Sequence, residues 1–157
     1  VNVDLMGHPV DLRWNLDRPL PFALGTVDGI FHEHLLEHLP LQAGLEFLRS
    51  SYRLLRPGGV LRVVVPDAGA YLESYTSGGA GMIEQVRPGR PTDMLVVNEL
   101  FYNYTHAAMY DEETLALFMK AVGFEDVKRR EFGESRLQPC PDSDHRRPES
   151  LYVEAVK

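Results

Sequence analysis

Residues 41–65 constrain the fold of this chain more than any other part of the sequence. From residue 41 to 55, leucines and a tyrosine recur at helical spacing, which predicts an amphipathic helix with one apolar face. The sequence Arg-Pro-Gly-Gly at 56–59 then ends that helix in a tight turn. Residues 60–65 are mostly β-branched, which is typical of a strand buried in a parallel sheet. A helix that leads straight into such a strand predicts an α/β fold.

Strand and helix patterns alternate along the rest of the chain. The last two predicted strands have no helix between them, so an antiparallel strand is expected at that edge of the sheet. Residues 77–91 are rich in glycine, proline and arginine and predict a mobile surface segment, and the charged residues 142–147 predict a solvated loop. Further strands are predicted at 1–5, 10–12, 27–32, 124–132 and 150–156, and further helices at 68–75, 92–104 and 111–122.

Composition bounds the number of domains and the kinds of partner. A length of 157 residues suits a single domain over 1–157. The formal net charge of −7 argues against binding to nucleic acid or to an anionic membrane, since both need a positive field. No apolar run approaches the roughly 20 residues that span a bilayer, and the first residues lack the shape of a signal peptide. The single cysteine, Cys140, excludes an internal disulfide and fits a cytoplasmic protein.

Short motifs follow one another over nearly the whole chain. They are Asn2-Val3-Asp4-Leu5, Leu36-Glu37-His38-Leu39, RLLRPGGVL at 53–61, YDEETL at 110–115 and SLYVEA at 150–155. In this order they resemble the type-11 branch of class I methyltransferases, which use S-adenosylmethionine. The resemblance implies a Rossmann-like three-layer sandwich with strand order 3-2-1-4-5-7-6, mostly parallel with an antiparallel strand 7. It also implies a cofactor at the carboxyl ends of the strands, as is general for open α/β sheets.

The resemblance further implies which residues bind S-adenosylmethionine. Asp4 closes the first strand, where an acid accepts hydrogen bonds from the ribose hydroxyls, and a carboxylate suits this because it only accepts. Asn15 and Leu16 stand where the family has Asp-Leu facing the adenine, and the asparagine oxygen still accepts a hydrogen bond. His32 and Glu33 are expected beside the methionine end of the cofactor.

His34 is the candidate catalytic residue. A histidine at the substrate mouth suits a general base because its pKa lies near the operating pH; a structural hydrogen bond is the alternative. The implied acceptor is a small molecule or a saccharide. Downstream, Tyr102, Tyr104, His106 and Tyr110 form an aromatic cluster that either covers the acceptor pocket or belongs to the core.

A rival interpretation uses the sequence His34-Leu35-Leu36-Glu37-His38, which fits H-x-x-E-H. On a helix, the two histidines would bind zinc from one face and the glutamate would act as the base of a hydrolase. Pro40 biases Leu39 away from helix, and the residues before His34 have a strand pattern. The zinc hydrolase is therefore the less favoured interpretation, and no metal site is expected.

The glycine-rich loop of the resembled family is not found in this sequence. In that family the loop follows a central strand, and both would lie just before Val1. Loss of a central strand leaves two rows of unpaired backbone groups. The chain could start late, residues 1–5 could slide into the vacant place, or a second copy could fill it in a strand-swapped homodimer. We expect weak cofactor binding or none, and a non-catalytic interaction or oligomerisation module is the alternative function.

Overall fold

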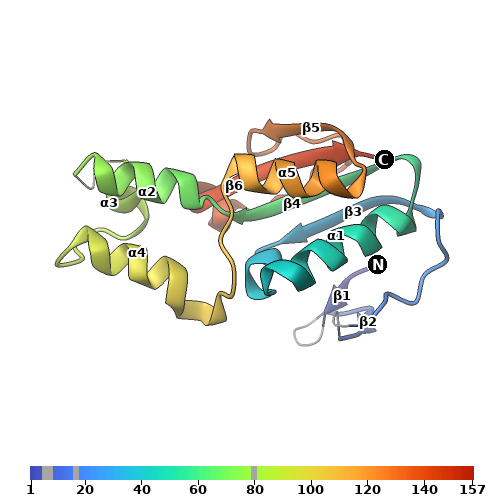
Figure 1. Cartoon of the computed structure of the whole chain (residues 1–157), viewed down its shortest axis with the longest axis horizontal. Helices are drawn as coiled ribbons and strands as arrows, with labels where there is room; N and C mark the ends of the chain where they lie inside the picture. The colour runs from blue at the N-terminus through green and yellow to red at the C-terminus, as the bar shows by residue number, and fades with distance from the viewer. Residues whose placement is uncertain (5–8, 16–17, 79–80) are drawn as a thin grey trace.

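The computed structural model describes residues 1–4, 9–15, 18–78 and 81–157 and has an α/β architecture (Figure 1). The strands are β1 (Val3–Asp4), β2 (Leu12–Arg13), β3 (Val27–Glu33), β4 (Leu55–Pro66), β5 (Glu125–Arg130) and β6 (Ser150–Val156). The helices are α1 (Leu41–Leu54), α2 (Ala68–Thr76), α3 (Met82–Val86), α4 (Asp93–Tyr102) and α5 (Glu112–Val122), with 3-10 helices η1 (Leu36–His38), η2 (Asn103–Thr105) and η3 (Asp144–Glu149).

The strand order confirms the expected topology: β3, β4, β6 and β5 take the places of strands 4, 5, 7 and 6 of the resembled family. The place of strand 1, beside β3, is open in the described residues. The main sheet has the order β3-β4-β6-β5, with β3 parallel to β4 and β6 antiparallel to both of its neighbours. Strands β1 and β2 form a separate parallel pair. In the described part of the chain β1 pairs with β2 alone, so the alternative in which the strand predicted at 1–5 takes the vacant place beside β3 is wrong for its described residues. The late start and the swapped copy stay predictions.

Helices α1 and α5 cover one face of the main sheet (Figure 1). Their apolar side chains pack on alternate residues of the strands, such as Leu61, Val63 and Val65 of β4, all fully buried. Helix α5 is sharply defined: Asp111 accepts from the backbone N–H of Thr114 at its start, and left-handed Gly123 ends it. The apolar spacing that predicted both helices is thus explained by this shared core.

The opposite face of the sheet is covered by residues 131–149, in which the short 3-10 helix η3 is the only helix. Arg62 points from β4 into this layer, is fully buried, and binds both carboxylate oxygens of Asp142 at 2.6 Å. Its guanidinium also donates to the carbonyls of Glu131 and Glu134 and lies 3.6 Å from Glu154. The expected solvated loop is therefore wrong at Asp142, because this carboxylate neutralises a buried cation.

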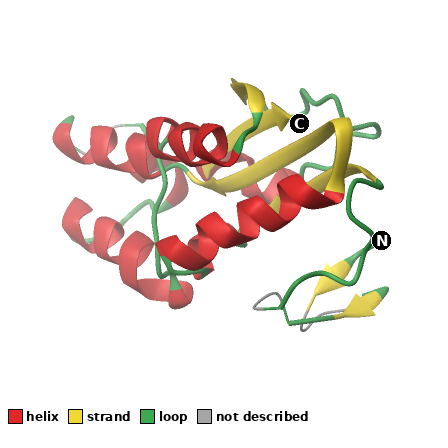
Figure 2. Ribbon diagram, turned by 45° about the vertical axis from the view of Figure 1, so that its right-hand side comes forward, coloured by secondary structure: helices red, strands yellow, loops and turns green. Residues whose placement is uncertain are grey.

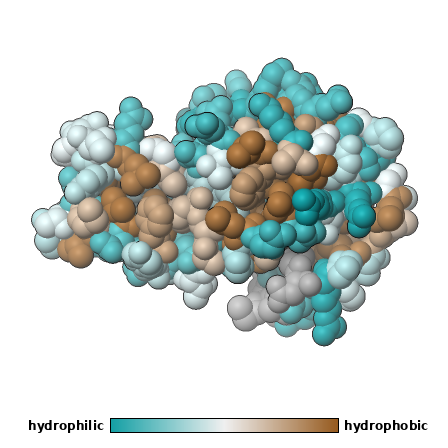
Figure 3. Space-filling model, viewed as in Figure 1, coloured by the Kyte–Doolittle hydropathy of each residue, from teal (hydrophilic) through white to brown (hydrophobic). Residues whose placement is uncertain are grey.

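A helical lobe of α2, α3 and α4 extends beyond the carboxyl ends of β3 and β4 (Figure 2). Its core joins Tyr71 of α2, Ile83 of α3, and Val96 and Leu100 of α4. The predicted loop at 77–91 is wrong at α3, since Ile83 is buried there. On the visible face, apolar side chains gather over the lobe (Figure 3). No helix in the described residues is long and apolar enough to cross a membrane.

Candidate functional site

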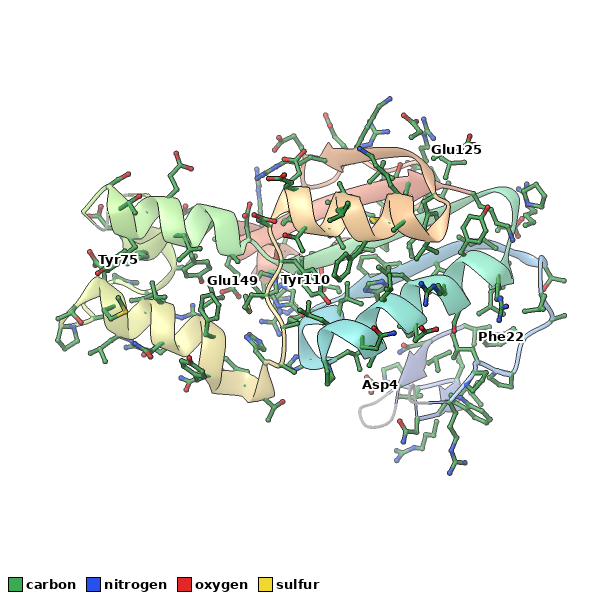
Figure 4. All side chains as sticks on the ribbon, viewed as in Figure 1. Asp4, Phe22, Tyr75, Tyr110, Glu125 and Glu149 are labelled. Atoms are coloured by element: carbon green, nitrogen blue, oxygen red, sulfur yellow. The ribbon has the colours of Figure 1, made fainter. Side chains whose placement is uncertain are left out.

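A pocket of about 480 Å³ lies where the lobe meets the carboxyl ends of β3 and β4. Parallel strands end at the same edge of a sheet, so the turns that follow β3 and β4 meet there. The lobe supplies Tyr71, Arg87 and Glu99 to the wall, and η3 supplies Glu149. Figure 4 shows Glu149 and Tyr110 at this junction between the lobe and the sheet. The residues that line the pocket are His34, His38, Pro66, Tyr71, Arg87, Val96, Glu99, Leu100, Tyr104, Thr105, His106, Arg146 and Glu149.

The floor of the pocket is the turn that follows β3. His34 has a positive φ of 49°, so the chain leaves the strand abruptly and enters η1. The carbonyl of Glu37 accepts from the backbone N–H groups of Ala107 and Ala108 at 2.8 and 3.0 Å. These two bonds bring His106 beside the turn, although it is distant in sequence. The His38 and His106 rings then meet edge to face, with centroids 5.0 Å apart.

Burial shifts the titration of the floor residues. It raises the pKa of Glu37, whose side chain is completely buried, from 4.5 to about 7. For His34, burial and then the charge of Arg146 lower the pKa from 6.5 to about 3. The two side chains face each other, with His34 Nδ1 3.3 Å from Glu37 Oε1. His34 is therefore neutral at neutral pH, and the expectation that its pKa lies near the operating pH is wrong, because the ring is buried and lies near the Arg146 cation.

The wall of the pocket carries a charged network. Glu149 accepts from the Tyr71 hydroxyl at 3.1 Å and pairs with Arg87 at 3.2 Å. Arg146 also lies near Glu149, at 3.6 Å. Burial and the charge of Glu149 raise the pKa of Tyr71 above its ordinary value, so its hydroxyl stays protonated and can donate. The wall thus offers a cation, a hydroxyl and a carboxylate to a polar ligand.

A second cavity, of about 800 Å³, lies between β1 and β3 at the open position of the sheet order. Asn2 and Val3 line one side, Ile30 and His32 of β3 line the other, and Leu137 covers the strand. His32 is buried against Phe47, and neither of its ring nitrogens has a hydrogen-bond partner among the described residues. Burial lowers its pKa from 6.5 to about 4. We call this cavity the β1–β3 groove.

The residues predicted from the sequence fall into two groups. Asp4 is exposed at the end of β1, Asn15 is exposed two residues after β2, and Leu16 lies outside the described residues. His32 lines the groove, the Glu33 carboxylate accepts from the backbone N–H of Ser143, and His34 lines the pocket beneath the lobe. The structure therefore groups His32, Glu33 and His34 at the end of β3, whereas Asp4 lies in β1 and Asn15 lies two residues beyond β2.

Several residues that line the pocket were not predicted from the sequence. Arg87 stands in a segment expected to be a surface loop, and Glu149 follows a stretch expected to be solvated. The aromatic cluster is divided: Tyr104 and His106 line the pocket, Tyr110 belongs to the core, and Tyr102 is 78% exposed. No local pattern marks these roles, because each depends on how the lobe packs on the sheet.

A family model for methyltransferase domains matches residues 4–129. The chain belongs to this methyltransferase family. No curated protein matches it. Among solved structures, the domain resembles SAM-dependent methyltransferases at TM-scores of 0.53. The one from Archaeoglobus fulgidus is 18% identical, and the match covers 87% of this chain and 62% of that chain. The one from Aquifex aeolicus is 16% identical, with 94% of this chain and 54% of that chain covered. The one from Thermotoga maritima is 19% identical, with 92% of this chain and 62% of that chain covered. The domain thus spans less than two thirds of each of these chains, and the likeness establishes the class I fold.

S-adenosylmethionine is the cofactor that these comparisons indicate. Some residues beside the β1–β3 groove fit this cofactor. The two unpartnered ring nitrogens of buried His32 are groups that a bound ligand would satisfy. Asp4, which the sequence resemblance assigns to the ribose, is exposed at the end of β1. No glycine-rich loop follows a strand before β3 in the described residues, so these contacts supply only one side of a site.

Proposed function

We propose that this methyltransferase domain transfers a methyl group from S-adenosylmethionine to a small-molecule acceptor, such as a saccharide, held in the pocket beneath the lobe. The observation that supports this most is the pocket itself. Its volume of about 480 Å³ lies within the range of small-ligand sites. It opens at the carboxyl edge of β3, the edge at which ligands bind in open α/β sheets.

The β1–β3 groove and its edges would take the cofactor, and the pocket beneath the lobe would take the acceptor. His32, which lines the groove, would hold the cofactor together with Asp4, Asn15 and Glu33, and Leu16 stays a predicted contact outside the described residues. The cofactor supplies the methyl group. Arg87, Glu149 and the Tyr71 hydroxyl would orient acceptor hydroxyls. Alignment of the acceptor atom with the methyl group accounts for most of the expected rate, because positioning replaces a bimolecular encounter.

His34 is the proposed base for an acceptor hydroxyl. The Ser150 hydroxyl donates to the Arg146 carbonyl at 2.7 Å, so it accepts from His34 Nε2 at 2.8 Å. His34 Nδ1 is then the nitrogen with the free lone pair. A proton taken there would be shared with the Glu37 carboxylate 3.3 Å away. In this role, His34→Gln lowers kcat and leaves KM nearly unchanged.

Calorimetric titration with S-adenosylhomocysteine tests the proposal. We expect weak binding or none by these 157 residues, and one-site binding once the residues encoded immediately upstream are included. Release of S-adenosylhomocysteine with a panel of sugars and small hydroxyl compounds then measures transfer. Tight one-site binding of S-adenosylhomocysteine by the 157 residues would refute the expectation that they bind the cofactor weakly. No binding by either polypeptide would favour an interaction module that uses the open β1–β3 groove.

A further inference from the structure

Three side chains converge on one point in the floor of the pocket: Glu37, His38 and His106. The oxygen and nitrogen atoms that they offer all lie within 4.8 Å of one another. Glu37 and His38 come from η1, and His106 is held beside them by the two backbone bonds to the Glu37 carbonyl. We call these residues the floor cluster. Its position and donor types are independent of any S-adenosylmethionine site.

The carboxylate of the floor cluster is buried without a hydrogen bond. Glu37 is 0% exposed, and neither of its oxygens has a hydrogen-bond partner among the described residues. Its close polar neighbours are imidazole nitrogens, His34 Nδ1 at 3.3 Å and His38 Nε2 at 4.0 Å from Oε1. A buried carboxylate in this condition needs a proton or a cation beside it.

Hydrogen bonds on the far side of each ring fix which nitrogen carries the proton. The Leu100 carbonyl can only accept, so His106 Nδ1 donates to it at 2.6 Å and Nε2 keeps its lone pair. The Thr105 hydroxyl donates to the Tyr104 carbonyl at 2.5 Å, so it accepts from His38 Nδ1 at 3.3 Å. His38 Nε2 therefore also keeps its lone pair.

The same logic gives His34 a lone pair on Nδ1, because its Nε2 donates to Ser150. Three imidazole lone pairs thus surround a carboxylate that has no donor. A proton on Glu37 would satisfy one of them and leave the others unpaired. Metal-binding histidines characteristically donate their second ring N–H to a carbonyl or hydroxyl, as His106 and His38 do here.

We propose that the floor cluster binds one divalent transition-metal ion through a Glu37 oxygen, His38 Nε2 and His106 Nε2, with His34 Nδ1 as a fourth donor beside them. Two or three imidazoles with one carboxylate are a donor set that suits zinc and similar ions. The nearby cation Arg146 is paired with Glu149, which limits its repulsion of the metal. The proposal goes beyond methyl transfer and does not depend on it, although an ion bound to His34 Nδ1 would occupy the lone pair that the proposed base uses.

Calorimetric titration of the chain with zinc chloride, in buffer free of chelators and of S-adenosylmethionine, tests this inference. We expect one ion per chain. His38→Ala and His106→Ala abolish stoichiometric binding, and His34→Ala weakens it by roughly tenfold or more. His145→Ala is the matched control, because His145 is exposed in η3 and should leave binding unchanged. Cobalt(II) titration adds a visible spectrum that changes with the loss of each imidazole.

His38 has a partly exposed side chain, so His38→Ala is expected to fold. This variant therefore tests the proposal even if a substitution at buried Glu37 prevents folding. Circular dichroism checks each variant. Absence of stoichiometric zinc on the wild-type chain, or its retention by the His38→Ala/His106→Ala double variant, would overturn the proposal. Either result leaves the S-adenosylhomocysteine titration untouched, so the two proposals fail separately.

Discussion

His32 should make the free energy of unfolding fall as the pH drops from neutral. The ring is buried at the end of β3, and burial lowers its pKa from 6.5 to about 4. Between these two values the unfolded chain binds the proton more readily than the folded chain does. Protonation in that window therefore favours unfolding, and the stability present above pH 6.5 is lost progressively towards pH 4.

The size of the effect follows from the two pKa values. At pH 5 nearly all unfolded chains carry a protonated His32, whereas only about one tenth of folded chains do. The difference in bound protons, integrated from pH 7 to pH 5, amounts to a loss of about 2 kcal/mol in the free energy of unfolding. Such a loss is a sizeable share of the stability of a small domain.

Urea unfolding at a series of pH values, for the wild type and for His32→Phe, measures this. Phenylalanine occupies similar space against Phe47 and does not titrate. Subtraction of the two curves removes the contributions of other groups. These include His34, whose lowered pKa of about 3 acts in the same direction, and Glu37, whose raised pKa of about 7 acts in the opposite one. A wild-type-minus-variant difference that stays flat from pH 7 to pH 5 would refute the reasoning.

Three further predictions concern packing. Arg62→Leu should lower the free energy of unfolding by about 3–5 kcal/mol, because it leaves buried Asp142 without its cation, and a neutral variant would contradict the buried pair. Gly44→Ala should cost about 1–3 kcal/mol, since the new Cβ would lie 2.7 Å from the Tyr110 hydroxyl. Combination with Tyr110→Phe should restore most of that loss in a double-mutant cycle. Asp111→Ala should cost about 1 kcal/mol through loss of the α5 cap, measured by thermal unfolding against Glu113→Ala.

Much of the fold could be predicted from local patterns because the core is built from them. The apolar face at 41–55 became α1, the run at 60–65 became the second half of β4, and β6 matches its predicted range of 150–156. The ends differ where tertiary pairing decides. Strand β4 already begins at Leu55, because this residue pairs with Val27, and the predicted Arg-Pro-Gly-Gly turn forms an irregularity inside the strand. The start of β4 is therefore set by pairing with the neighbouring strand β3, which a local sequence pattern does not contain.

The layer over the second face of the sheet could not be predicted for a related reason. Arg62 reads as a polar interruption in a β-branched run, and Asp142 reads as part of a charged surface loop. Each residue alone is most stable in water. Together they form a bidentate pair that is buried by residues 131–149, and only the folded chain brings them to 2.6 Å. Opposite charges at a separation of 80 residues carry no signal in a single sequence.

The H-x-x-E-H pattern identifies three side chains that do lie close together, but it predicts the wrong geometry for them. On a helix, His34 and His38 would share one face, but here the chain turns through a positive φ at His34 and into η1. The turn directs His34 Nδ1 and His38 Nε2 towards Glu37, so that the glutamate lies among the donors where the motif would make it a base. The further donor, His106, is recruited through the backbone bonds between Glu37 and residues 107–108. Removal of His106 alone therefore separates the two geometries, since a helical motif would keep its zinc and the floor cluster would lose it.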